Sequence, residues 1–206
     1  MRSLQGINNG EKSGDDNIAI ARRIFLSYKT EVFRDNEDDE FVIKNSIAKE
    51  FEISFSSIEV AGSSKTGISF FKEKLFEPGK SDLDIAVISL PLYNRFLEQA
   101  HKSTDGFSNL TVFPTFRNQR TDRQFINSLP KGYINPFFMP NSLLKSKWLN
   151  FFQKLSNKYF KTFKNINGGI YASEYFFEFK QKDCIDQYLK NKEKYDQISD
   201  SLKGAD

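Results

Sequence analysis

The chain has 206 residues and a formal net charge of +3, with 38% hydrophobic residues, among them 22 Phe. This composition is too apolar and too aromatic for a disordered protein, and the length is sufficient for one sizeable core. The only Cys, Cys184, rules out a disulfide within the chain, and the only His, His101, rules out a multi-histidine metal site. Because no signal peptide and no membrane-length apolar run are visible, we expect a cytoplasmic protein that does not bind membranes.

The first quarter of the sequence is predicted to be mostly helical. Residues 1–15 are polar and glycine-bearing, so we expect them to be flexible. Residues 17–33 carry a loose apolar stripe at helical spacing, which predicts a helix. Residues 36–53 predict a second helix, whose first turn is acidic, as the helix dipole favours. We expect residues 16–206 to form a single domain.

The middle of the chain alternates short apolar runs with turns. The patterns predict a strand over residues 56–63 that ends in a Gly-Ser turn, and then a short helix over 69–76. A β-branched strand should follow over 81–89, and Pro91 should open a helix over 91–102. Residues 109–116 predict a strand that Pro114 interrupts.

The C-terminal half begins with a proline-bearing loop, residues 117–140. Residues 142–163 predict a long helix, whose apolar positions recur at helical spacing and should face the core. Residues 165–173 read as a glycine turn that leads into a strand, and a last helix should run from 174 to 198. Together the elements predict an α+β fold with a small mixed sheet flanked by helices and a helical C-terminal extension.

Positive charge is concentrated between Arg117 and Lys164. This segment has three Arg and seven Lys against one acid, Asp122, so its net charge is 10 − 1 = +9. Such a block suits an anionic partner such as nucleic acid or a triphosphate, and it equally suits a solvated face. Within it, Arg117, Arg120 and Arg123 are candidates to grip a triphosphate tail or an RNA backbone, or else they form a basic surface loop.

Two carboxylates lie where a buried strand should have apolar residues. In "SDLDIAVIS", Asp82 and Asp84 are two residues apart and therefore point to the same face of a strand, while Leu83, Ile85 and Val87 point to the other. Adjacent carboxylates repel each other unless a positive charge lies between them. Mg²⁺ is often held by one or two carboxylates together with substrate phosphates, so the pair predicts a Mg²⁺ or Mn²⁺ site.

The turn upstream of this strand suits a phosphate. Gly62 has no side chain, so the backbone can approach a phosphate closely. Ser63, Ser64 and Thr66 offer hydroxyl groups, and Lys65 adds a positive charge. The turn and the acidic strand together predict a site for a nucleoside triphosphate and a divalent cation.

These two motifs, "GSSKTG" and "SDLDIAV", resemble the DNA polymerase β-like nucleotidyltransferase superfamily. The resemblance covers about residues 57–89. It implies that Gly62 and Ser63 contact phosphate and that Asp82 and Asp84 hold the catalytic metal. It also implies transfer of a nucleotidyl group with loss of pyrophosphate, catalysed mainly by positioning and electrostatics.

The family usually adds a third carboxylate on a later strand beside the acidic strand. Residues 109–116 contain no acid, and Glu174 and Glu178 are candidates if the preceding strand continues through them. If Ser173 caps a helix instead, they are ordinary acids of its first turns. We expect a nucleotidyltransferase acting on an RNA end or a partner protein, in a defence or toxin–antitoxin setting. The alternatives are a nucleotide-signal synthase and a non-catalytic module that binds nucleotide or nucleic acid.

Overall fold

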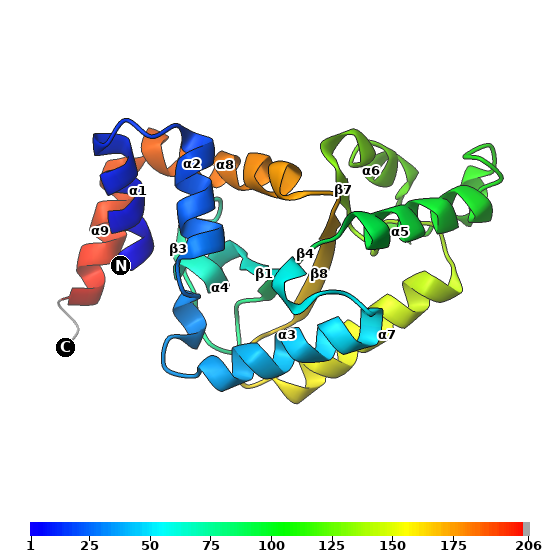
Figure 1. Cartoon of the computed structure of the whole chain (residues 1–206), viewed down its shortest axis with the longest axis horizontal. Helices are drawn as coiled ribbons and strands as arrows, with labels where there is room; N and C mark the ends of the chain where they lie inside the picture. The colour runs from blue at the N-terminus through cyan, green and yellow to red at the C-terminus, as the bar shows by residue number, and fades with distance from the viewer. Residues whose placement is uncertain (204–206) are drawn as a thin grey trace.

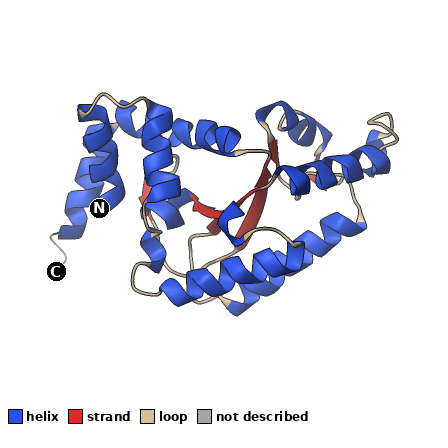
Figure 2. Ribbon diagram, viewed as in Figure 1, coloured by secondary structure: helices blue, strands red, loops and turns tan. Residues whose placement is uncertain are grey.

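A computed structural model describes residues 1–203, and it shows a mixed α+β protein built on a four-stranded sheet (Figures 1 and 2). The strand order is β1-β4-β8-β7. Strand β4 (Leu83–Ile88) is central, with β1 (Ile58–Ala61) antiparallel on one side and β8 (Ile166–Tyr171) parallel on the other. The two-residue strand β7 (Tyr133–Ile134) pairs with the last two residues of β8.

One face of the sheet is covered by helices α3 (Glu37–Phe51), α5 (Leu90–Ser103) and α7 (Leu143–Lys158). As the sequence predicts, Leu83, Ile85 and Val87 are buried on this face. Helices α3 and α5 end within two residues of their predicted ranges, whereas α7 ends at Lys158, five residues before the predicted end at 163. The apolar residues of all three recur at helical spacing and point toward the sheet. This face forms the larger of two apolar clusters.

The second apolar cluster lies on the opposite face and extends beyond it. It is formed by α1 (Arg2–Lys12), α2 (Asn17–Arg22), the π-helical turn η1 (Arg23–Ser27), α8 (Glu174–Lys190) and α9 (Lys192–Lys203). In Figure 1 the N- and C-terminal helices α1 and α9 lie beside each other at one end of the molecule. The predicted last helix is therefore split in two, with Asn191 between its parts.

The prediction that residues 1–15 are flexible is wrong, because most of that segment forms helix α1. Leu4 and Ile7 are buried in the second cluster. Gly6 packs against Ile24 and Tyr28, and Gly10 packs against Ile20. The glycines that suggested a loose end instead let this helix approach α2 closely.

Two further predictions in the middle of the chain are wrong. Residues 69–76 are not a helix but a small ribbon of β2 (Ile68–Ser69) and β3 (Lys74–Leu75). Residues 109–116 are not a continuous strand, because Pro114 separates the 3₁₀ turn η4 (Leu110–Val112) from β5 (Thr115–Phe116).

The remaining short elements surround the sheet. The expected loop at 117–140 contains a second strand of a hairpin, a short helix, a 3₁₀ turn and a sheet strand: β6 (Gln119–Arg120), α6 (Asp122–Ile126), η5 (Leu129–Lys131) and β7. Three more short elements are η2 (Glu31–Phe33), η3 (Phe55–Ser57) and α4 (Gly62–Thr66). Helix α4 follows β1 directly, and this brings its first residue to the C-terminal end of that strand.

Candidate active-site cleft

A cleft of about 800 Å³ runs along the open edge of β8. The two-residue strand β7 pairs only with Ile170 and Tyr171, so residues 166–169 have no partner strand on that side among residues 1–203. These four residues line the cleft together with parts of β4, α7 and α8. Figure 1 shows α7 and α8 on opposite sides of β8, so they form two walls of the cleft.

The two predicted carboxylates lie beside two asparagines of the neighbouring strand. In the parallel register of β4 and β8, Asp84 lies opposite Asn167, and both side chains are exposed in the cleft. Two residues earlier in each segment, Asn165 donates a hydrogen bond from Nδ2 to Oδ1 of Asp82 (3.0 Å). Asp82 precedes the first residue of β4, and its charge acts on Asp84. Asp84 therefore lines the cleft, whereas Asp82 is not among the lining residues and acts on Asp84 through its charge.

Gly62 lies directly against Asp84. Its backbone has φ +64°, in the left-handed region that favours glycine, and a Cβ placed on it would lie 2.5 Å from Oδ2 of Asp84. No other residue type fits here without displacing that carboxylate. The glycine of the turn and the acid of β4, which are 22 positions apart in sequence, therefore meet in one wall of the cleft.

The rest of the predicted phosphate turn is directed into the protein. Ser64 Oγ donates to the carbonyl of Ala61, Thr66 Oγ1 donates to the carbonyls of Gly62 and Ile68, and both residues are buried. Lys65 is buried too, and its Nζ donates to the carbonyl of Tyr28. Of the five residues, Gly62 lines the cleft and Ser63 stays partly exposed beside it. The placement does not support phosphate contacts from Ser64, Lys65 or Thr66.

Lys65 belongs to a separate group of buried charges behind α4. Burial lowers the pKa of Lys65, and Glu59 opposes this effect. Burial likewise raises the pKa of Glu59, and Lys44, whose Nζ lies 3.8 Å from the carboxylate, opposes it. The lysine therefore anchors α4 to the rest of the fold and does not face the cleft.

The strand beside β4 has no third carboxylate facing the cleft; its residue opposite Asp84 is Asn167. Strand β8 ends at Tyr171, and α8 begins at Glu174, so neither proposed acid lies on the strand. Glu178 is buried and pairs with Arg22, which donates to it from Nε (2.5 Å) and from a second nitrogen (2.8 Å). Glu174 is an exposed acid in the first turn of α8, and both glutamates are thus the ordinary helix acids of the alternative reading.

The electrostatic environment of Asp84 favours a cation. The pKa of Asp84 is raised to about 6, first by desolvation and then by the charge of Asp82, while Lys72 and a hydrogen bond with Asn167 oppose the shift. The carboxylate touches solvent on its cleft side, while protein surrounds it elsewhere. Burial and the charge of Asp84 raise the pKa of Tyr133 to about 12, so this phenol stays protonated beside the cleft. A divalent cation would relieve the repulsion between the two carboxylates.

The residues of the cleft fit one divalent cation. Asp84 offers carboxylate oxygens and the two asparagines offer amide oxygens in the cleft, with the Asp82 carboxylate held beside them by Asn165, and Mg²⁺ prefers oxygen ligands. Within residues 1–203, no group of three or more His, Cys, Asp or Glu side chains is arranged to hold a metal. Cys184 lines the cleft as well, but burial raises the pKa of its thiol to about 12, which makes it a poor nucleophile.

Only part of the basic block is free to meet a partner. Lys145 is buried and donates to the carbonyl of Met139, Arg120 pairs with Asp122, and Lys147 pairs with Glu50. The other cations of the block are exposed: Arg117, Arg123, Lys131, Lys154, Lys158, Lys161 and Lys164. The +9 of the sequence therefore overstates the charge available to a partner.

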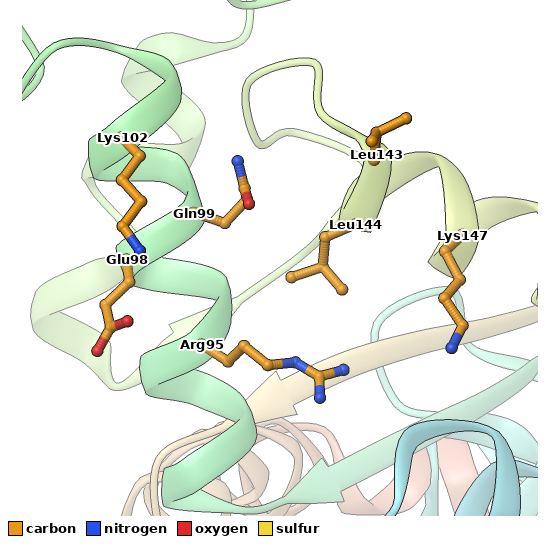
Figure 3. Close-up of a pocket in the computed structure, with 7 residues that line it drawn as sticks. All are labelled: Arg95, Glu98, Gln99, Lys102, Leu143, Leu144 and Lys147. Carbon is orange, nitrogen blue, oxygen red and sulfur yellow. The ribbon is translucent and has the colours of Figure 1, made fainter.

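A second hollow lies between α5 and α7 (Figure 3). Arg95 and Lys102 of α5 and Lys147 of α7 line it, together with Glu98. It shares no lining residue with the cleft, and it has neither a carboxylate pair nor a glycine turn. The cleft is therefore the better candidate for chemistry.

Sequence reasoning missed Asn165 and Asn167. Nothing in "NINGGIY" marks an asparagine as a site residue, because only the pairing of β8 with β4 places these side chains beside the two aspartates. The signal that was present is indirect: the resemblance implies a third acid on a strand beside the acidic strand, and β8 is one of the two strands that pair with β4.

Compared with known proteins, the chain matches no family model, no curated protein and no solved structure. Within the part of the chain that the structure describes, no helix is both long enough and apolar enough to cross a membrane.

Proposed function

We propose that the protein is a divalent-cation-dependent nucleotidyltransferase that moves a nucleoside monophosphate from a nucleoside triphosphate to a hydroxyl group. One observation carries the proposal: the glycine of a Gly-Ser turn lies against the second acid of a D-x-D strand, within one cleft. The nucleotidyltransferase-like fold suggested by the sequence is part of this proposal. The strand order around β4 supports it, because a strand parallel to β4 lies where the family carries its third acid.

In the proposed reaction, an acceptor oxygen forms a bond to the α-phosphorus while the bond from that phosphorus to the bridging oxygen breaks. Pyrophosphate leaves, and the proton of the acceptor hydroxyl is released to solvent. Gly62 leaves room for the triphosphate to approach the backbone, and Ser63 offers a hydroxyl beside it. Asp82 and Asp84 would hold Mg²⁺ or Mn²⁺, which supplies charge stabilisation for the phosphates. Asn165 and Asn167 orient the two carboxylates.

The acceptor that we favour is an RNA end, and a hydroxyl of a partner protein is the other outcome. The exposed cations from Arg117 to Lys164 favour a polyanion over a protein. A nucleotide acceptor would make the protein a synthase of nucleotide signals.

One experiment tests the activity. The purified protein is incubated with each of the four α-labelled ribonucleoside triphosphates, Mg²⁺ or Mn²⁺, and total RNA, and label in RNA, protein and small products is separated by electrophoresis and chromatography. Wild type should transfer label from at least one nucleotide. The transfer rate of Asp84→Asn should be at least about 100-fold lower, because the variant lacks a proposed metal ligand. Asp105→Asn, which alters an exposed acid away from the cleft, should behave as wild type.

A second candidate is a module that binds nucleotide without turning it over. Asn167 favours it, because an uncharged amide stands opposite Asp84 where the family has a third acid. This candidate predicts nucleotide binding that depends on Gly62 and no label transfer with any nucleotide. If wild type neither transfers label nor binds a triphosphate, both candidates fail.

A further inference from the structure

We propose that a stacking platform, consisting of Phe116, Arg117, Phe137 and Phe138, binds the unpaired bases of single-stranded nucleic acid and leads the strand into the cleft. This inference rests on the proposed function for its biological meaning, because it names the acceptor as a single-stranded polynucleotide. The platform residues differ from the proposed catalytic residues, however, and measurements of nucleic-acid binding test the platform without any measurement of activity.

The platform is an exposed cluster of aromatic rings on the lining of the cleft. Phe116 is 38% exposed and Phe137 is 42% exposed, although their rings are only 5.2 Å apart. Phe138 packs against both, with ring centroids 6.3 Å and 5.3 Å away. Phe71, from the turn of the β2–β3 ribbon, also lines the cleft and is 61% exposed. Rings that pack on one another but remain partly in solvent offer free faces on which any base can stack.

The backbone that carries Arg117 is under conformational strain. Strands β5 and β6 are joined by a two-residue turn in which both Arg117 (φ +50°) and Asn118 (φ +61°) are left-handed. Such turns favour Asn, Asp and Gly, and an Arg in this conformation costs conformational energy. The guanidinium lies 5.1 Å from the centroid of the Phe116 ring. The chain thus holds a cation at the hairpin tip, over an exposed ring, where glycine would suit the turn better.

The charge around the platform is complementary to a polyanion. Arg123 and Lys131 are exposed on α6 and η5, the elements that connect β6 to β7. Among the described residues, neither of these cations nor Arg117 has an acidic partner within 4.0 Å. The hydroxyl of Thr121, at the start of α6, donates to the carbonyl of Phe138, so α6 and the platform are held together. One nucleotide would engage few of these cations, whereas a strand with successive phosphates can engage several.

The test is the affinity of the full-length protein for a fluorescein-labelled, unstructured 12-nucleotide RNA, measured by fluorescence anisotropy at low salt. Phe116→Ala and Phe137→Ala should each raise the Kd by about 5- to 150-fold, the range expected for loss of one base–aromatic stack. Arg117→Gly should raise the Kd while thermal stability stays the same or increases, because glycine relieves the left-handed strain. Phe137→Tyr retains a ring and should bind within about 2-fold of wild type.

A matched control is Phe41→Ala, which removes another exposed Phe that contacts a second ring, lies on α3 and does not line the cleft. It should leave the Kd unchanged. DNA of the same sequence should bind within about 10-fold of the RNA, because stacking does not require the 2′-hydroxyl group, while a blunt RNA duplex should bind at least about 10-fold more weakly, because its bases are already paired and stacked.

Three results with nucleic acid would overturn the platform, and a fourth would come from titration with a nucleoside triphosphate. The first three are equal affinity for duplex and single strand, equal Kd values for wild type and both Phe→Ala variants, and absence of binding by wild type. A parallel titration with nucleoside triphosphate separates the platform from the catalytic proposal. If the Phe→Ala variants lose triphosphate affinity as much as RNA affinity, the rings hold the substrate base and the platform proposal is wrong. If RNA binding behaves as expected but no label is transferred, the proposed reaction fails and the platform stands.

Discussion

Two pairs of an aspartate and an asparagine mark the candidate site at the level of single residues. Asp82 accepts a hydrogen bond from Asn165, and two residues further along the strands Asp84 lies opposite Asn167. An amide can donate to a carboxylate and also offer its oxygen to a cation, but it adds no negative charge. The site therefore has two carboxylates where the family resemblance implies three, and its attraction for a second divalent cation is correspondingly weaker.

Replacing Asp84 by Asn should stabilise the metal-free protein at neutral pH. The pKa of Asp84 in the folded state is raised to about 6, first by desolvation and then by Asp82. Relative to a carboxyl with an ordinary pKa, Asp84 contributes its full stabilisation below the unfolded-state pKa of about 4, where it is protonated in both states. That contribution is lost as the pH rises through about 6 and the folded-state carboxyl ionises. The Tm difference between Asp84→Asn and wild type should therefore increase between pH 5 and pH 8.

The increase should be small, at most about 1 kcal/mol or about 2–4 °C, because the exposed side of the carboxylate is screened by solvent. Thermal melts in EDTA across this pH range measure it. A variant that melts below wild type at pH 8 would show that desolvation and the charge of Asp82 do not destabilise the ionised Asp84 carboxylate as expected. Titration with Mn²⁺, followed by electron paramagnetic resonance, should then show weaker binding to the variant.

Gly62→Ala and Gly14→Ala form a matched pair. Both glycines have positive φ, +64° and +75°, so each Ala should cost about 1–2 kcal/mol of stability from backbone strain. A Cβ at Gly14 meets nothing within 4 Å, whereas one at Gly62 displaces Oδ2 of Asp84. Only Gly62→Ala should therefore weaken binding of Mn²⁺ and of a nucleoside triphosphate, by at least about 10-fold. Calorimetric titration checks this, and equal affinities in the two variants would contradict the close approach.

At the scale of elements, α7 both supports the sheet and lines the cleft. Trp148 is 1% exposed and packs against Phe51, Phe96 and Phe152 with ring centroids 4.5, 5.3 and 4.8 Å away. Trp148 and Phe152 also cover Gly168 of β8, where a Cβ would lie 2.4 Å from Phe152. The helix thus holds in place the strand that carries Asn167.

Trp148→Ala should destabilise the fold by about 3–5 kcal/mol, because it leaves a cavity in the larger apolar cluster. Leu143, at the start of the same helix, is 91% exposed, and Leu143→Ala should change stability by less than about 0.5 kcal/mol. Urea unfolding followed by circular dichroism measures both. A loss below about 1 kcal/mol for Trp148→Ala would contradict the central role of this ring.

At the scale of the whole molecule, one sheet joins two apolar clusters. The larger cluster contains α3, α5 and α7, and the smaller contains the helices from both ends of the chain. Tyr195 of α9 is fully buried, packs on Phe70 and Tyr188, and donates a hydrogen bond to the carbonyl of Phe70 (2.5 Å). The C-terminal helix is therefore bound to the β2–β3 ribbon that carries Phe71.

Substitutions of Tyr195 test whether this contact supports the molecule. Tyr195→Ala should cost about 3–5 kcal/mol through the cavity it leaves, and Tyr195→Phe about 1–3 kcal/mol, because the Phe70 carbonyl loses its partner. Circular dichroism and intrinsic fluorescence should follow one common transition if both clusters unfold together. A separate early transition in Tyr195→Ala would show instead that the terminal helices unfold independently.

The sequence by itself determined the features that depend on local pattern. Apolar spacing located α3, α5 and α7, and the alternation around Asp82 and Asp84 correctly predicted which residues of β4 are buried. Sequence could not reveal that residues 1–15 form a packed helix, because the role of Gly6 and Gly10 is visible only beside Ile20, Ile24 and Tyr28. Polar and small residues predict a loose end until a partner surface is known.

The tertiary structure alone decided the composition of the cleft. Strand pairing between β4 and β8 connects residues that are more than 80 positions apart, and local propensity carries no information about such a register. The pairing placed Asn167 opposite Asp84, and the short β7 left part of the edge of β8 open. The packing of α4 directed Ser64, Lys65 and Thr66 into the interior. Motif spacing fixes which residue types are adjacent along the chain, whereas packing fixes which of their side chains reach the same solvent-filled space.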